Sequence, residues 1–254
     1  MKAFLYRSQA LCTFIFIGQL CASAKGESWP QFRGPNGDGV STAENVPLEF
    51  GEEKNLAWKT ELPGRGWSSP VSDGSTLWMT TAIESFTTEE ARKAKQKADG
   101  EEERKFKSRQ VANRIELAVV QVDLATGEIL QEIPLRAIEE PQTIHTLNSF
   151  ASPTPVLEGE ILYAHFGTFG TFAIDTSRGS LAWETQVSLE HGVGPGSSPF
   201  LYRDLLILIC DGVDQQFVAA LDKRDGKQVW RSDRPEMRAP LGDQKKSYNT
   251  PILI

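Results

Sequence analysis

The stretch that decides the fold is Ala220-Leu-Asp222-Lys-Arg-Asp-Gly226-Lys-Gln-Val-Trp230. The same spacing recurs upstream in Ala173-Ile-Asp175-Thr-Ser-Arg-Gly179-Ser-Leu-Ala-Trp183. A weaker copy, Gln121-Val-Asp123-Leu-Ala-Thr-Gly127, is followed by Gln131 where the other two have tryptophan. Self-similarity at a period of about 48 residues indicates a stacked or radial array of structural units.

One repeat unit, residues 197–230, predicts four short strands. Pro199 opens the first strand, and Leu205-Leu-Ile-Leu-Ile-Cys210 is an apolar run too short for a helix. A third strand ends at Asp222, and Asp225-Gly226 is a strong hairpin signal before the fourth. Four antiparallel strands that repeat around an axis form the blade of a β-propeller.

The residues that stand out in the repeat are expected to have structural roles. The aspartate can accept hydrogen bonds from the backbone of its own turn, and the glycine supplies the positive φ of the hairpin. The tryptophan, on an outer strand, is expected to pack between neighbouring blades, so Trp230→Ala should cost about 3–5 kcal/mol. These structural residues are Asp123, Gly127, Asp175, Gly179, Trp183, Asp222, Gly226 and Trp230.

A second marker accompanies the repeat, a serine or threonine before proline. Its copies are Ser69-Pro70, Ser152-Pro153, Ser198-Pro199 and Thr250-Pro251. Each is expected to begin the first strand of a blade, because proline is tolerated at the start of a strand.

The 11-residue unit resembles the tryptophan-docking motif of the PQQ-like, quinoprotein-type β-propellers. Residues 29–41, Trp-Pro-Gln-Phe-Arg-Gly-Pro-Asn-Gly-Asp-Gly-Val-Ser, resemble the opening of a bacterial subfamily of these repeats that is abundant in planctomycetes. The resemblance to BamB-type outer-membrane assembly proteins concerns repeat type. It implies an all-β propeller with about three blades and a partial fourth, the N-terminal part of a ring of about seven or eight blades.

The chain divides into three parts. Residues 1–24 have a basic start, an apolar stretch and an Ala22-Ser-Ala24 cleavage pattern, which is typical of a secretory signal peptide. Residues 25–66 form an N-terminal segment, and Asn55-Leu-Ala-Trp58 within it resembles an outer strand that closes the ring. Residues 67–254 carry the propeller repeats, with a charged helical insertion at 85–113 that is either a tolerated surface feature or a lid that docks a partner. A periplasmic or secreted location follows, with no transmembrane segment after signal removal.

Charge and cysteine content narrow the function classes. The formal net charge of −7 argues against a nucleic-acid partner. Cys12 and Cys21 lie in the signal segment, so Cys210 remains alone in an apolar strand and is expected to be a core residue.

Loops that enter the first strands of the blades could form a polar cup at the mouth of the channel. The candidate residues are His145, Asn148, His191, Asp211, Asp214, Gln216 and Asn249. Histidine is the side chain able to change charge near neutrality, so His145 and His191 are possible bases or ligands. The alternative is that all seven only satisfy turns. His165 lies in an apolar strand and is expected to be structural, and no metal site is predicted.

Two functions from different classes remain open. The first is a non-catalytic binding or assembly scaffold with a protein partner or a small molecule at the channel mouth, and no cofactor. The second, which the resemblance implies, is an alcohol or sugar dehydrogenase that uses PQQ and calcium. Such enzymes commonly carry a vicinal disulfide, and this sequence has no Cys-Cys pair. Glycan binding is a third possibility without a discriminating motif.

Overall fold

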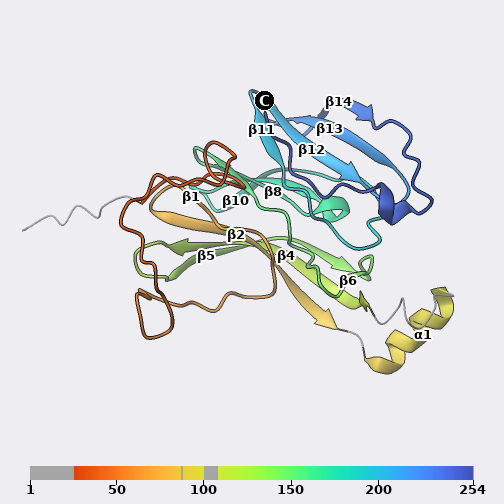
Figure 1. Cartoon of the computed structure of the whole chain (residues 1–254). Helices are drawn as coiled ribbons and strands as arrows, with labels where there is room; N and C mark the ends of the chain where they lie inside the picture. The colour runs from red at the N-terminus through yellow and green to blue at the C-terminus, as the bar shows by residue number, and fades with distance from the viewer. Residues whose placement is uncertain (1–25, 87, 100–107, 254) are drawn as a thin grey trace, which may run out of the picture.

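The structure, a computed structural model, describes residues 26–86, 88–99 and 108–253. Three four-stranded antiparallel sheets dominate it, and the strands of each follow one another in chain order (Figure 1). The first sheet contains β1 (Val71–Ser72), β2 (Thr76–Phe86), β4 (Ala112–Asp123) and β5 (Ile129–Glu139), the second β7 (Val156–Glu158), β8 (Ile161–His165), β9 (Thr171–Asp175) and β10 (Ser180–Thr185), and the third β11 (Phe200–Tyr202), β12 (Leu205–Asp211), β13 (Gln216–Asp222) and β14 (Gln228–Asp233). The predicted four-stranded propeller blades are confirmed, and we call these sheets blades one, two and three.

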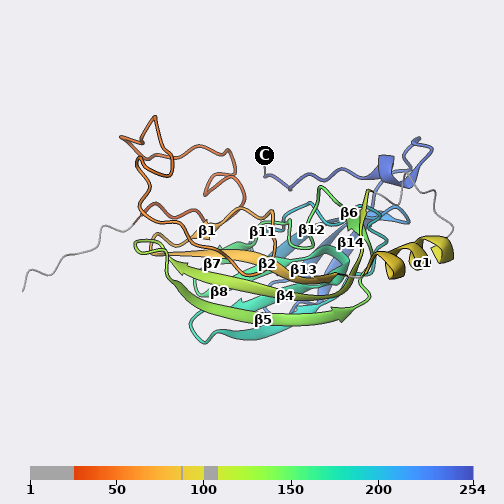
Figure 2. The same cartoon turned by 90° about the horizontal axis from the view of Figure 1, so that it is seen from below.

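The charged insertion lies between β2 and β4 of blade one. It contains α1 (Glu89–Asp99), which projects away from the sheets (Figure 2), and β3 (Arg109–Gln110), which pairs with β6 (Ile144–His145). The insertion is shorter than the expected 85–113, because β2 continues to Phe86 and β4 already begins at Ala112. Two short 3₁₀ turns, η1 (Gly167–Phe169) and η2 (Gly242–Lys245), complete the described elements. The expected signal peptide, residues 1–24, lies outside the described residues.

The hydrophobic core lies between the faces of neighbouring blades. One cluster joins blades one and two and includes Trp78, Leu117 and Phe172. A second joins blades two and three and includes Leu208 and Phe217, with Cys210 buried among them as expected. Each blade is therefore stabilised by burying apolar surface against the next.

The aspartate of the repeat has the role predicted for it. Asp123 Oδ1 accepts hydrogen bonds from the backbone N–H groups of Ala125 (2.9 Å) and Thr126 (2.8 Å). Asp175 and Asp222 accept corresponding bonds in the turns of blades two and three. These bonds favour the ionised carboxylate, and the hydrogen bond from Thr126 accordingly lowers the pKa of Asp123.

The tryptophan of one blade docks on the glycine of the next. The Trp183 indole donates a hydrogen bond to Lys223 O (2.9 Å), and its ring lies so close to Gly226 that a Cβ there would be 2.5 Å from the ring. Thr185 Oγ1 donates to Gly226 O (2.7 Å). A small residue with positive φ is thus required opposite the indole.

The N-terminal segment repeats this contact on blade one. Residues 55–60 form no strand, yet Trp58 Nε1 donates to Leu124 O (3.0 Å) and Thr60 Oγ1 donates to Gly127 O (2.6 Å). The Trp58 ring covers Gly127 as Trp183 covers Gly226. Segment 55–60 therefore occupies the place that an outer strand of a preceding blade would take.

Trp230 differs from the expectation. It lies on β14, whose six residues are all exposed, and 39% of its own surface is accessible. Within the described part of the chain no blade follows β14, so the inter-blade packing expected of Trp230, with its loss of about 3–5 kcal/mol, is not observed there. Trp183 does make this contact.

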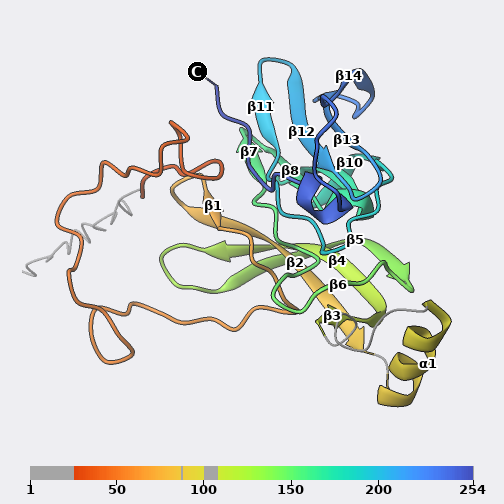
Figure 3. The ribbon, with the colours of Figure 1, turned by 45° about the vertical axis from the view of Figure 1, so that its right-hand side comes forward.

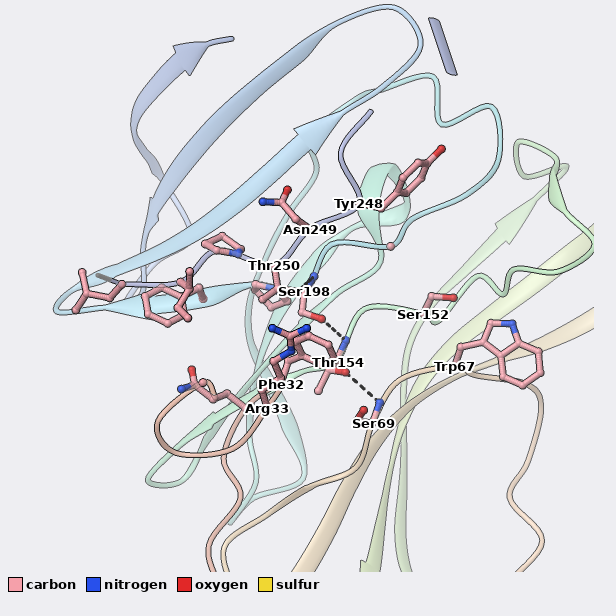
Figure 4. A pocket seen from close by; sticks show the side chains of 18 of the residues that line it. Phe32, Arg33, Trp67, Ser69, Ser152, Thr154, Ser198, Tyr248, Asn249 and Thr250 are labelled. Atoms are coloured by element: carbon pink, nitrogen blue, oxygen red, sulfur yellow. Dashed lines mark hydrogen bonds between the residues drawn. The ribbon is translucent and has the colours of Figure 1, made fainter. Parts of the chain in front are cut away.

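Hydroxyl groups connect the starts of the first strands. Ser69 N donates to Thr154 Oγ1 (3.0 Å), and Thr154 N donates to Ser198 Oγ (2.9 Å) (Figure 4). Ser198 N in turn donates to Thr250 Oγ1 (3.2 Å). The equivalent residue of blade two is therefore Thr154, before Pro155. The alignment on Ser152-Pro153 was wrong by two residues, because Ser-Pro-Thr-Pro offers two matches. We call this chain of hydrogen bonds the hydroxyl ladder.

Thr154→Val should lower the free energy of unfolding by about 1–2 kcal/mol, because the partly buried N–H of Ser69 loses its acceptor while the side-chain shape is kept. Thr154 is 2% exposed, so water does not replace the lost acceptor easily. Urea unfolding measures the effect. Thr154→Ser is the matched control, since it keeps the hydroxyl and loses a methyl group. Equal stability of the valine variant and wild type would contradict a contribution from the ladder.

Candidate functional site: the first-strand cavity

A cavity of about 720 Å³ lies between the starts of the first strands and the N-terminal segment. We call it the first-strand cavity (Figure 4). Its lining combines aromatic rings, amides and hydroxyls with one guanidinium: Phe32, Trp67, Phe200 and Tyr248; Gln31, Asn36, Asn148 and Asn249; Ser69, Ser152, Thr154, Ser198 and Thr250; and Arg33. Neither a carboxylate nor an imidazole is among its lining residues.

The N-terminal segment enters this cavity because its backbone pairs with blade one. Trp29 and Ser72 exchange two backbone hydrogen bonds, each of 2.9 Å, and Leu157 N of blade two donates to Pro30 O (2.8 Å). The chain then turns under the Trp29 ring at Gly34, where φ is +76° and a Cβ would lie 2.8 Å from the ring. This turn brings Phe32 and Arg33 to the cavity. Among the described residues, no carboxylate forms an ion pair with Arg33.

Trp67 has an exposed side chain on a backbone that is hydrogen-bonded to the segment that leads into blade two. Its side chain is 59% exposed, while its backbone N–H donates to Ala151 O (3.0 Å). The Arg65 guanidinium lies 5.6 Å from the ring centroid. Arg65 is itself held by Gln110 Oε1 (2.8 Å) and by the carbonyl of Asn148. An exposed indole on a fixed backbone is a feature typical of binding sites.

Two of the seven candidate residues line the first-strand cavity. Asn148 Nδ2 donates to Val193 O (2.9 Å) and Pro195 O (3.0 Å), which fixes this amide at the cavity wall. Asn249 reaches the cavity from the C-terminal segment, which lies beside β11 (Figure 3), and its Oδ1 accepts from Ser247 Oγ (2.5 Å). Asn148 Oδ1 also accepts from Ser149 N (2.8 Å) and Ser152 Oγ (2.6 Å), so this amide is satisfied within the protein and shapes the cavity wall.

His191 and Asp211 lie in a separate small cavity. His191 Nε2 accepts the N–H of Thr168 (2.8 Å), and burial, followed by the charges of Lys246 and His165, lowers its pKa to about 3. Asp211 Oδ2 accepts from Arg234 and from both the N–H and the hydroxyl of Ser247. His191 is therefore neutral at physiological pH, and neither group faces the first-strand cavity.

The side chains of the other three candidates form hydrogen bonds with backbone groups. His145 Nδ1 accepts from Leu147 N (3.1 Å), Asp214 Oδ1 accepts from Glu190 N (3.0 Å), and Gln216 Nε2 donates to Gly212 O (2.9 Å). None of them lines either cavity. His165 is also structural, because it is buried and its Nδ1 lies 2.8 Å from Thr171 Oγ1.

The residues present do not fit calcium-bound PQQ, which the resemblance implies for the enzymes of this fold. Calcium takes six to eight oxygen ligands and prefers carboxylates. Within the described ranges, no three histidine, cysteine, aspartate or glutamate side chains gather closely enough to hold a metal ion. Asp211 and Glu84, two buried carboxylates, are paired with Arg234 and Arg65.

Comparisons with known proteins agree with this architecture. The family model described as outer membrane protein assembly factor BamB matches residues 116–248. No curated protein matches the chain. In the part of the chain that the structure describes, no helix has the length and apolar character needed to span a membrane.

Several solved structures are similar to this chain. BamB from Moraxella catarrhalis is 18% identical, with a TM-score of 0.35, over 51% of this chain and 36% of its own. A quinohemoprotein alcohol dehydrogenase from Pseudomonas putida HK5 is 16% identical, with a TM-score of 0.35, over 49% and 19%. A europium-containing methanol dehydrogenase is 12% identical, with a TM-score of 0.41, over 70% and 26%.

The chain thus covers 36% or less of the length of each of these three solved proteins. The match to the family model extends over more than half of the 254 residues and therefore establishes the family. This chain belongs to the BamB family of PQQ-like β-propeller proteins.

Proposed function

We propose that this protein is a non-catalytic binding or assembly scaffold that recognises its partner at the first-strand cavity. The observation that carries the proposal is the composition of the cavity wall, which offers rings, amides, hydroxyls and the Arg33 guanidinium but no carboxylate or imidazole. General acid–base catalysis needs a positioned group that exchanges a proton near the operating pH. Such groups nearby, His191 and Asp211, are buried in contacts with the protein itself.

The exposed groups of the cavity suit a protein partner. Tryptophan, tyrosine and arginine are enriched among the residues that carry most of the binding energy of protein interfaces. Trp67 and Tyr248 are 59% and 43% exposed. The description of the family as an outer membrane assembly factor also supports a protein partner and an extracytoplasmic location, periplasmic or secreted. The signal-like residues 1–24 support the same location.

Loss of partner binding tests the scaffold directly. A tagged full chain purified from its own cell envelope should retain a partner that the Trp67→Ala and Arg33→Ala variants lose. Trp230→Ala is the matched control, because it removes another exposed indole that does not line the cavity. Equal retention by the wild type and the cavity variants would contradict recognition at this cavity.

A thermal shift separates the scaffold from a quinoprotein dehydrogenase. Saturating PQQ with calcium should leave the Tm of the scaffold unchanged. A ligand at one hundred times its Kd would stabilise an enzyme of this type by about 2.7 kcal/mol, because it binds the native state alone. A dye-linked assay with short alcohols and sugars accompanies the measurement. A raised Tm together with turnover would contradict the scaffold function and support the quinoprotein dehydrogenase.

A further inference from the structure

A second cavity, between blades two and three, has the size of a single water molecule. Its volume is about 20 Å³, and it shares Gly196 and Tyr248 with the first-strand cavity. The polar side chains in its lining include His165, His191, Asp211 and Lys246. A buried water needs a space of about 10–15 Å³ and two to four polar partners. The cavity satisfies the size condition.

Two of the lining residues, His191 and Asp211, each have a buried atom, Nδ1 and Oδ1, that no hydrogen bond from the described residues reaches. The two residues are only 4% and 7% exposed, so bulk water does not reach these atoms. The other side-chain atoms are already engaged. His191 Nε2 accepts from Thr168 N, and Asp211 Oδ2 accepts from Arg234 and Ser247. Each side chain therefore has one unused hydrogen-bonding position.

The hydrogen bond from Thr168 fixes the tautomer of His191. Because Nε2 accepts an N–H, it carries no proton, and the neutral ring must be protonated at Nδ1. His191 Nδ1 is thus a donor, whereas Asp211 Oδ1 is an acceptor. A metal ion cannot bind a protonated Nδ1. An anion without a proton has nothing to donate to Asp211 Oδ1, although the Lys246 ammonium also lines the cavity. The occupant must accept one hydrogen bond and donate another.

We propose that this cavity binds one water molecule, which accepts from His191 Nδ1 and donates to Asp211 Oδ1. Asp211 ends β12 of blade three, and His191 lies in the loop that leads from blade two to blade three. The water therefore links the two blades at a point where their direct contacts leave polar atoms unpaired. It also lies next to the first-strand cavity, since Tyr248 and Gly196 line both.

A crystal structure of the full chain at high resolution tests the site. The expected result is one density peak at hydrogen-bond distance from both His191 Nδ1 and Asp211 Oδ1. An empty cavity, or a peak at the shorter distances of a coordinated metal ion, would overturn the proposal.

Long-range ¹H–¹⁵N NMR on the full chain tests the tautomer independently. His191 is expected as the Nδ1–H form, and the Nε2–H form would sink the argument. Oxygen-17 relaxation dispersion then counts the long-lived waters, and His191→Phe should have one fewer than wild type, whereas His145→Phe should keep the number. An unchanged count in a folded His191→Phe protein would contradict the assignment. If that variant does not fold, the crystal and tautomer measurements still decide.

Discussion

Trp183→Ala is expected to lower the free energy of unfolding by about 3 kcal/mol, at the lower end of the range for aromatic truncations because the indole is half-buried. The variant loses the hydrogen bond to Lys223 O and the packing of the ring on Gly226. It also loses the contact with Tyr163, whose ring centroid lies 6.1 Å away. The three losses act together at the junction of blades two and three. Chemical denaturation of the full chain measures the effect.

Trp230→Ala is the matched control for this experiment. Both tryptophans stand at the same position of the repeat, but β14 has exposed residues throughout and Trp230 contacts no described blade beyond it. Its truncation should cost less than about 1 kcal/mol, as for most surface substitutions. Equal losses at the two positions would show that the docking contact is not what stabilises the chain.

A double-mutant cycle with Gly226→Ala isolates the docking contact. Alanine at this position is destabilising for two reasons. The backbone φ is +71°, which an L-residue with a Cβ rarely adopts, and its Cβ would lie 2.5 Å from the Trp183 ring. In the Trp183→Ala background the clash with the ring is absent, whereas the close approach to Thr185 Oγ1 (2.6 Å) and the backbone strain remain. The glycine substitution should therefore cost less there than in the wild type. Simple additivity of the two losses would mean that the ring and the glycine do not interact.

The sequence predicts the blades well because the residues that specify strands and turns recur at a regular spacing. The spacing from Asp222 to Trp230 specifies a strand, a tight turn and a second strand, and these local rules hold in all three blades. What the repeat does not specify is the neighbour that a docking residue meets. Trp183 and Trp230 occupy the same position of the repeat in sequence, and only tertiary contact distinguishes the half-buried indole from the exposed one.

The candidate site is harder to predict, because part of it comes from the N-terminal segment, which lies outside the sequence repeats. Phe32 and Arg33 reach the cavity through a turn at Gly34 and through backbone pairing between Trp29 and Ser72, which no spacing rule describes. The polar residues that sequence analysis selected were chosen for their chemistry. His191 and Asp211 are indeed buried near the cavity, but the bonds that they make with Thr168 and Ser247 depend on contacts across blades or with the C-terminal segment.

Acidification should destabilise the protein already above pH 4, through its two buried histidines. Burial lowers the pKa of His165 to about 4. Burial, followed by the charges of Lys246 and His165, lowers the pKa of His191 to about 3. A histidine in the unfolded chain has a pKa of about 6.5. Between these limits the unfolded chain binds protons that the native chain does not. The contribution of the two neutral histidines to the free energy of unfolding is therefore fully present above pH 6.5 and falls as the pH decreases. Each histidine contributes a slope of about 1.4 kcal/mol per pH unit, about 3 kcal/mol for the pair.

The free energy of unfolding, measured by denaturant titration between pH 7.5 and 4.5, tests this slope. Glu84 acts in the opposite direction, because burial raises its pKa and the native chain then gains a proton first. Aspartates whose pKa is lowered, such as Asp175, lose their contribution at lower pH and so interfere little in this window. His165→Gln should halve the slope, and His145→Gln is the matched control for removal of an imidazole. A stability that does not change from pH 7 to pH 4.5 would contradict the burial of two neutral histidines in the native chain.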